Sequence, residues 1–165
     1  MSITHVVGID PGLVHTGVVS LFFSKPERTL FVRHGVISGA SAADVARLTV
    51  SFNNFKRPDE IFIEGYRPRS HFLQDKKMVE AVSKIHAALP GSKVLNNTGV
   101  TKVVKRATLE LLGCWAFSTP THHDDLRSAA RIAVLGMLKD KKMNLLLGEF
   151  VNAHIEGEPW SVVAG

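Results

Sequence analysis

Three apolar runs open the chain, and turn-forming residues separate them. His5–Asp10, Gly17–Phe23 and Thr29–Ile37 predict strands, because β-branched and aromatic residues are frequent in them. Lys25-Pro26-Glu27 supplies a turn between the second run and the third. Three strands so close in sequence predict a β-meander.

The next stretch changes from strand periodicity to helical periodicity. Ser41 is a suitable N-cap, and apolar residues recur at helical spacing after it, which predicts a helix over residues 42–55. Pro58-Asp59 ends this helix. Glu60–Glu64 (EIFIE) then predicts a buried central strand whose last residue is acidic.

The remaining pattern predicts helices on both sides of one further strand. An amphipathic helix is marked by Met78, Val82, Ile85 and Leu89 and ends at Pro90-Gly91. A strand is predicted over Lys93–Leu95 and a helix over residues 101–112. A long helix starts at Pro120-Thr121 and reaches about Met143. The order βββαβαβαα predicts an α/β fold with a mixed five-stranded sheet flanked by helices. Residues 144–165 show no clear period and receive no assignment.

Three acidic residues occupy positions that this order can bring together. Asp10 ends the first strand, Glu64 ends the fourth, and Asp125 lies in the first turn of the last helix. If the first and fourth strands are adjacent and parallel, Asp10 and Glu64 emerge at the same edge. Such a carboxylate cluster is stable mainly when divalent cations neutralise it. Two Mg²⁺ or Mn²⁺ ions about 4 Å apart suit oxygen ligands and support phosphodiester hydrolysis.

Asp10 and the acids at the start of the last helix also have structural interpretations, whereas Glu64 at the end of an apolar strand is harder to explain in this way. Asp10-Pro11-Gly12 is common β-turn chemistry. Thr121 and Asp124 form a pair typical of a capping box, and acids at a helix N-terminus suit the macrodipole. That second interpretation explains one acid and leaves Asp125 and the two preceding histidines unexplained.

The two histidines before the last helix differ in their expected roles. His122 and Asp125 are three residues apart and share a helix face, which Ala129 and Ile132 continue into the core. This polar pair at the head of an apolar stripe indicates the wall of a site. His123 is expected to point elsewhere as an exposed neighbour, and a register shift of one residue would exchange the two roles.

Three short motifs carry a family resemblance. Gly8–Gly12 followed by Thr16-Gly17 (GIDPGLVHTG) closely resembles the opening motif of the RuvC-type Holliday junction resolvases. Ile63-Glu64 resembles the second family motif, and His122–Leu126 resembles the third. The resemblance implies a ribonuclease-H-like fold and a homodimer that uses Mg²⁺ to nick two symmetric strands of a four-way junction. The metal ligands that it implies are Asp10, Glu64, His122 and Asp125.

The segment after Glu64 combines aromatic and basic residues without an apolar period, which indicates a loop that contacts DNA beside the site. Its candidate residues are Tyr66, Arg67, Arg69 and Phe72, and either aromatic is suited to stack on an unpaired base. Lys102 and Lys105 are further candidates for phosphate contacts. Residues 96–121 are shorter than in the bacterial family members, which suggests a compact variant similar to phage-borne ones.

Composition agrees with this picture. The chain has 165 residues, of which 45% are hydrophobic, so we expect a single domain over residues 1–165. A net charge of +5 and a pI of about 9.6 favour a polyanionic partner. One cysteine, Cys114, excludes an internal disulfide, and residues 1–5 lack a signal-peptide pattern, so we expect a cytoplasmic protein with no membrane role.

The expected activity is in-line attack of a metal-activated water on a phosphodiester near a strand exchange point, leaving a 5′-phosphate. Cleavage of flaps or other branched DNA, or of RNA–DNA hybrids, requires the same fold and chemistry and remains an alternative. A branched-DNA binder without activity is disfavoured because all the acids are present. An actin-like or sugar-kinase-like ATP-binding protein is disfavoured because that fold needs two domains and a second glycine-rich loop. The sequence identifies no branch-migration partner.

Overall fold

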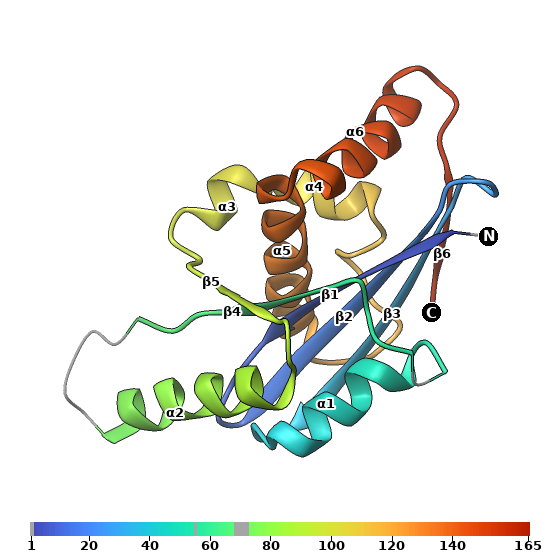
Figure 1. The fold of residues 1–165 in the computed structure, drawn as a ribbon. Coiled ribbons are helices and arrows are strands. Elements are labelled where there is room, and N and C mark those ends of the chain that lie inside the picture. Colours follow the sequence, from blue (N-terminus) through green and yellow to red (C-terminus); the bar gives the residue numbers. More distant parts are fainter. Residues whose placement is uncertain (1, 55, 68–72) are drawn as a thin grey trace.

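The computed structural model describes residues 2–54, 56–67 and 73–165. Six strands form one mixed sheet in the order β5-β4-β1-β2-β3-β6 (Figure 1). They are β1 (Ile3–Asp10), β2 (His15–Ser24), β3 (Thr29–Ser38), β4 (Glu60–Glu64), β5 (Lys93–Leu95) and β6 (Ser161–Ala164). The first three form the predicted antiparallel meander, and β4 pairs with β1 in parallel.

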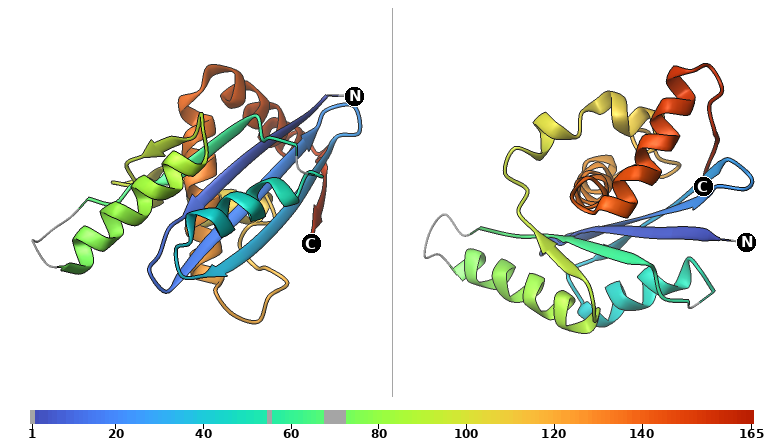
Figure 2. Two further views of the ribbon diagram at one scale, coloured as in Figure 1. Left: turned by 60° about the horizontal axis from the view of Figure 1, so that its bottom comes forward. Right: turned by 45° about the horizontal axis from the view of Figure 1, so that its top comes forward.

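Helices cover both faces of this sheet (Figure 2). They are α1 (Ala42–Ser51), α2 (Leu73–Ala88), α3 (Val100–Val103), α4 (Arg106–Leu111), α5 (His123–Lys139) and α6 (Lys141–Ile155). α1 and α2 lie on one face, whereas α5, with α3, α4 and α6 around it, lies on the other (Figure 2). Among the described residues, no helix combines the length and apolarity needed to cross a bilayer.

The alternation of side chains along β1 decides which face each residue serves. Val7 and Ile9 belong to the hydrophobic cluster beneath α1 and α2, whereas Val6 belongs to the cluster around α5. Because strand side chains alternate between faces, Gly8 and Asp10 share the face of Val6. Asp10 therefore ends its strand on the side of the sheet that carries α5.

Gly8 allows α5 to pack directly on the backbone of the sheet. A methyl group placed on Gly8 would lie 2.0 Å from the carbonyl oxygen of Ala129 and 2.9 Å from the side chain of Ala133. Ala129 and Ala133 are fully buried. This contact between small residues brings the first turns of α5 close to the end of β1.

The sheet has one strand more than the five predicted. β6 pairs in parallel with β3, and its four residues are exposed. A short exposed edge strand carries no burial pattern that a sequence can reveal, and here it forms because Trp160 packs into the core beside Phe23 and Phe150. The otherwise unassigned residues 144–165 thus supply most of α6 and an edge strand.

Three predicted helices have different limits in the structure. The last helix ends at Lys139 because Asp140 adopts an extended conformation and caps α6, accepting a 3.0 Å hydrogen bond from the Met143 amide. The predicted helix over residues 101–112 is two short helices, because Val104 and Lys105 between them are extended. The first helix ends at Ser51 rather than at residue 55, which lies outside the described residues.

The close contact at Gly8 predicts a large effect of one added methyl group. Gly8→Ala should lower the free energy of unfolding by about 3 kcal/mol, because neither the Ala129 carbonyl nor the α5 backbone can move without disturbing the core. Chemical denaturation measures this value. Gly148→Ala is the matched control: nothing lies within 4 Å of the added atom in α6, so stability should rise by about 0.5–1 kcal/mol. Equal effects of the two substitutions would contradict this account of the packing.

Candidate active site

Parallel pairing of β1 with β4 brings Asp10 and Glu64 side by side. Ile9 is opposite Ile63 in the register, so the next residue of each strand is acidic at the same edge. Phe62 packs in the cluster around α5, and Glu64, two residues later, is on that face as well. The two carboxyl groups are close enough that Glu64 adds to the rise that burial causes in the pKa of Asp10.

Gly17 brings Asp125 to the same place. Gly17 pairs with Asp10 across the β1–β2 ladder. A methyl group on Gly17 would lie 2.7 Å from the backbone oxygen of Asp125 and 2.9 Å from its carbonyl carbon, so the first turn of α5 rests on this glycine. The structure thus brings the three predicted acids together from β1, β4 and α5.

The loop after Asp10 is held by a buried hydroxyl. Thr16 is fully buried, and its Oγ1 donates a 2.8 Å hydrogen bond to the Gly39 carbonyl oxygen and accepts a 3.3 Å hydrogen bond from the Gly12 amide. The Asp-Pro-Gly turn therefore also shapes the acidic site. Because these hydrogen bonds fix the loop, β1 ends at a defined residue, and this sets the position of Asp10.

Crowding of the three carboxylates changes the protonation of Asp10. Burial raises the pKa of Asp10, the hydrogen bond with Glu64 and the charges of Glu64 and Asp125 add to the effect, and together they bring it to about 9. In the absence of a cation, the site therefore holds a proton at neutral pH. A divalent cation would compete with that proton for the same oxygen atoms.

Two neighbours hold the other acids. The Asn97 amide donates a 2.5 Å hydrogen bond to Glu64 Oε1. His122 Nδ1 lies 3.3 Å from Asp125 Oδ2. His122 is the N-cap of α5 and has a left-handed backbone (φ 64°), a conformation that costs free energy in a non-glycine residue and often occurs at functional sites.

The start of α5 differs in two ways from the predicted one. His122 precedes the helix instead of sharing its face, and it still reaches Asp125 because its left-handed backbone turns the ring toward that residue. The Thr121–Asp124 capping pair does not form, since His122 is the N-cap and Asp124 pairs with Arg127 at 3.2 Å.

His123 points away from the acids, as expected, but it is half-buried rather than exposed. Its Nε2 lies 2.7 Å from the Thr119 carbonyl oxygen, and its ring meets the edge of Phe117. These contacts give His123 a role in holding the chain segment before α5. Of the two histidines, His122 is the one beside Asp125.

His15 joins the site without having been identified from the sequence. Its ring centroid lies 4.1 Å from that of His122, with the planes tilted by 57°. The signal was present in the opening motif, because His15 precedes Gly17 by two residues on β2 and so shares its face of the sheet. The sequence pattern did not reveal that His122 would come to lie against it.

The donors present fit a hard divalent cation. Three carboxylates and one imidazole offer the oxygen-rich ligands that Mg²⁺ and Mn²⁺ prefer. Within residues 2–54, 56–67 and 73–165, no three His, Cys, Asp or Glu side chains already converge as ligands of one ion. The hydrogen bonds from Asn97 to Glu64 and from His122 to Asp125 hold two of the donors, and the proton of Asp10 occupies the third.

A polar cleft of about 420 Å³ opens beside Glu64. It lies between the loop after β5, α3 and the side of α5, and its polar lining residues include Asn97, Thr98, Thr101, Ser128 and Arg131. Lys102 follows in the last turn of α3 and Lys105 caps α4, both exposed. The two lysines predicted to contact phosphate therefore flank the elements that form this cleft.

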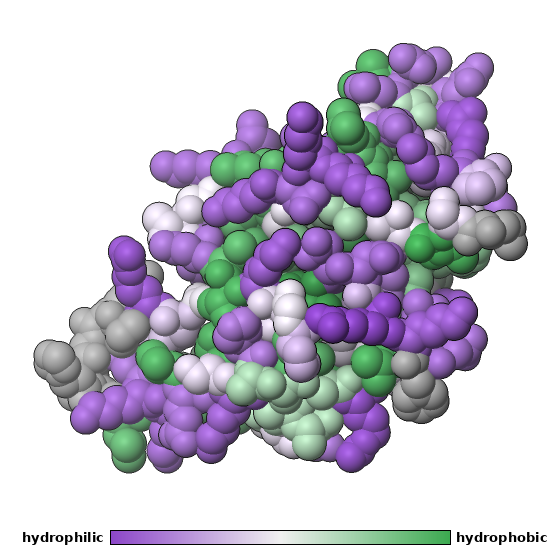
Figure 3. Space-filling view, viewed as in Figure 1, coloured by the Kyte–Doolittle hydropathy of each residue, from purple (hydrophilic) through white to green (hydrophobic). Residues whose placement is uncertain are grey.

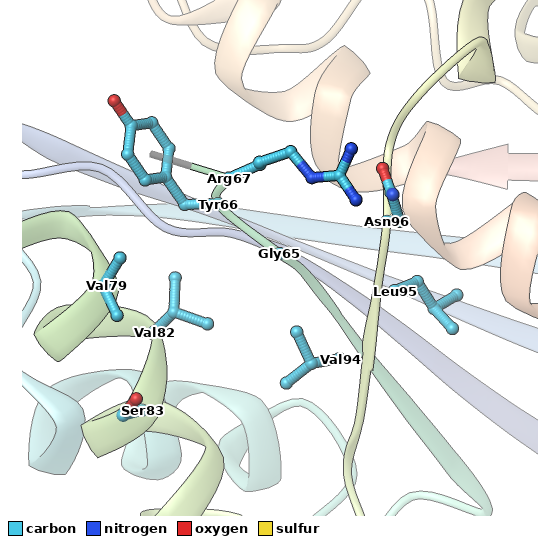
Figure 4. A pocket seen from close by; sticks show the side chains of 9 residues that line it. All are labelled: Gly65, Tyr66, Arg67, Val79, Val82, Ser83, Val94, Leu95 and Asn96. Carbon is cyan, nitrogen blue, oxygen red and sulfur yellow. The ribbon is translucent and has the colours of Figure 1, made fainter. Parts of the chain in front are cut away.

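A second pocket, of about 390 Å³, lies at the other side of the loop after β5, between β5 and α2 (Figure 4). Val79 and Val82 of α2 face Val94 across it, while Tyr66 and Arg67 lie at its rim, with the Arg67 guanidinium directed toward Asn96 (Figure 4). The Tyr66 hydroxyl donates a hydrogen bond to Asp75. Arg69 and Phe72, the other two predicted DNA contacts of this segment, lie outside the described residues.

Comparison with solved structures identifies the architecture. RuvC of Thermus thermophilus in complex with Holliday junction substrate aligns with a TM-score of 0.54 at 14% sequence identity, covering 95% of this chain and 98% of that one. The chain shares its fold with this structure. A second T. thermophilus RuvC structure gives a TM-score of 0.51 at 15% identity, with 95% and 99% coverage. No protein-family model and no curated protein matches by sequence. The predicted ribonuclease-H-like fold is thereby confirmed, with six strands in place of five.

The raised pKa of Asp10 predicts that the stability of the chain without metal depends on pH. The folded state keeps a proton that the unfolded chain releases near pH 4, so this group's contribution is complete below about pH 4 and is lost as pH rises toward about 9. Asp10→Asn removes that loss. The variant should therefore gain several °C in melting temperature relative to the wild type at pH 8 and little at pH 4.

Melting curves recorded with a chelator between pH 4 and pH 9 measure this difference. Asp124→Asn is the control, because it removes an exposed carboxylate from the helix turn that carries Asp125 without relieving the crowding around Asp10. A melting-temperature difference for Asp10→Asn that stays constant across this pH range would show that the pKa of Asp10 is not raised in the folded state.

Proposed function

We propose that the chain is a metal-dependent, structure-selective DNA endonuclease that resolves four-way junctions by paired symmetric nicks leaving 5′-phosphates. The observation that carries this proposal is the convergence of Asp10, Glu64 and Asp125 from three separate elements at one edge of the sheet. Residues 1–165 act as one nuclease domain. The net charge of +5 is consistent with a nucleic-acid substrate.

Each residue of the cluster has a distinct part in this chemistry. These residues would hold two Mg²⁺ ions, or Mn²⁺ in their place, and the ions would supply the activation of water and the stabilisation of the leaving oxygen. Asp10 lies between Glu64 and Asp125 and contributes oxygen ligands at the centre. His122 both orients Asp125 and offers a nitrogen ligand, and Asn97 holds Glu64 in place before metal binding.

We propose branched DNA as the substrate class. The support for it comes from structural similarity rather than from the residues of the site. T. thermophilus RuvC, which has the same fold, is in complex with a Holliday junction substrate. A homodimer would carry two equivalent sites, and a two-fold protein on a two-fold junction accounts for paired nicks. Tyr66, Arg67, Arg69, Phe72, Lys102 and Lys105 are proposed to contact the DNA around the cut.

Asp10→Asn should lower the rate of DNA cleavage by at least about 100-fold while DNA binding persists, because the variant loses a charged ligand that stabilises the transition state. Glu64→Gln should act in the same way. The control is Glu80→Gln, which removes an exposed acid of α2 that pairs with Lys84. Single-turnover cleavage in Mg²⁺ and binding by gel shift measure the two properties, and cleavage by Asp10→Asn at the wild-type rate would exclude the metal assignment.

A panel of substrates tests the choice of DNA structure. Purified protein with Mg²⁺ is expected to place symmetric paired nicks in a synthetic four-way junction and to cut a flap, a linear duplex and an RNA–DNA hybrid at least about tenfold more slowly. Equal rates on flap and junction would favour the branched-DNA alternative, and preference for the hybrid would favour a ribonuclease. ATP hydrolysis without nicking would replace the nuclease proposal with the kinase-like one.

A further inference from the structure

Arg131 shares the polar cleft with Glu64 and has no role in the proposed metal site. The cleft offers hydroxyl groups from Thr98, Thr101 and Ser128, and Arg131 lies on α5 one turn beyond Ser128. Arg131 is half-buried. The Thr98 hydroxyl already donates to Asn96 Oδ1, so the cleft presents a cation and the hydroxyl groups of Thr101 and Ser128 beside a proposed catalytic carboxylate.

Two contacts fix the position of this guanidinium. Arg131 Nε donates a 3.3 Å hydrogen bond to the Val104 carbonyl oxygen. Its guanidinium carbon lies 5.9 Å from the centroid of the Trp115 ring. α3 and α4 lie beside α5 (Figure 2). Hydrophilic side chains cover most of the molecular face that Figure 3 shows. The Nε contact leaves the terminal nitrogens available for a ligand.

Two other arginines contact the same indole, and they make an informative contrast. Arg106 lies 4.4 Å and Arg127 3.8 Å from the Trp115 centroid. Arg106 pairs with Glu110, and Arg127 pairs with Asp124. Among the residues that the structure describes, Arg131 forms no ion pair with a carboxylate. It is the member of this cluster whose charge is not neutralised, and it is the one in the cleft.

A half-buried, unpaired guanidinium is costly unless a ligand balances its charge. Arginine presents parallel N–H donors that match the oxygens of a phosphate, and hydroxyl groups with it are typical of phosphate contacts in nucleic-acid complexes. We propose that Arg131 binds a backbone phosphate of the DNA strand being cut, next to the scissile one, with Trp115 and Val104 holding its guanidinium in place. This inference rests on the proposed nuclease function and names a substrate contact within it.

The salt dependence of DNA binding tests this contact, because each neutralised phosphate contributes roughly 0.9 to the slope of log K against log salt on duplex DNA. In an Asp10→Asn background, Arg131→Gln should reduce that slope by about 0.9 and weaken binding of a fluorescent four-way junction by about tenfold at low salt. Arg131→Lys keeps the charge and should retain most of the slope. Fluorescence anisotropy over a range of salt concentrations gives both values.

Arg47→Gln is the matched control, since it removes one arginine charge that pairs with Asp44 on α1, across the sheet from the cleft. An unchanged slope for Arg131→Gln, with or without a lower melting temperature, would leave this arginine a structural role only and overturn the inference. An equal change of slope for Arg47→Gln would overturn it as well. If Arg131→Gln alone lowers the slope but the wild type nicks no DNA in Mg²⁺, the phosphate contact stands and the nuclease proposal fails.

Discussion

The contact of α5 with the backbone of β1 and β2 is the constraint on which the site depends. Gly8 and Gly17 leave no room for a side chain beneath the helix, so its first turns lie directly on the strands. That closeness brings Asp125 to Asp10, whose strand already runs beside that of Glu64. A helix packed at the usual distance over larger side chains would hold Asp125 too far away to share ligands with the two strand acids.

The meeting of the three carboxylates lowers the stability of the fold. Burial of Asp10, followed by its interactions with Glu64 and Asp125, raises its pKa to about 9, and His122 keeps an unfavourable left-handed backbone next to them. Native proteins retain such local costs chiefly at functional sites, where binding of a ligand relieves them. The proton on Asp10 and the hydrogen bonds from Asn97 and His122 are what hold this arrangement without a cation.

The loop between β5 and α3 separates two pockets beside the site, one polar and one apolar. Asn97 reaches Glu64 and lines the polar cleft, whereas Asn96, one residue earlier, lines the apolar pocket with Tyr66 and Arg67. Neighbouring residues of one loop thus face two hollows, one suited to phosphates and one with aliphatic walls. The proposed substrate, with a charged backbone and the flat faces of its bases, presents both kinds of group.

The sequence alone determined the strand alternation and the chain order of the acids, because side-chain period and turn chemistry are local properties. The meander and the positions of Asp10, Glu64 and Asp125 at or near the ends of their elements follow from them. Tertiary structure decided what depends on contacts between distant segments. These are the pairing of β1 with β4, the packing of α5 on Gly8 and Gly17, the edge strand β6, the break at Asp140, the contact of His15 with His122, and the place of Arg131 in the cleft. A local pattern shows which face a residue occupies, and only packing decides what that face meets.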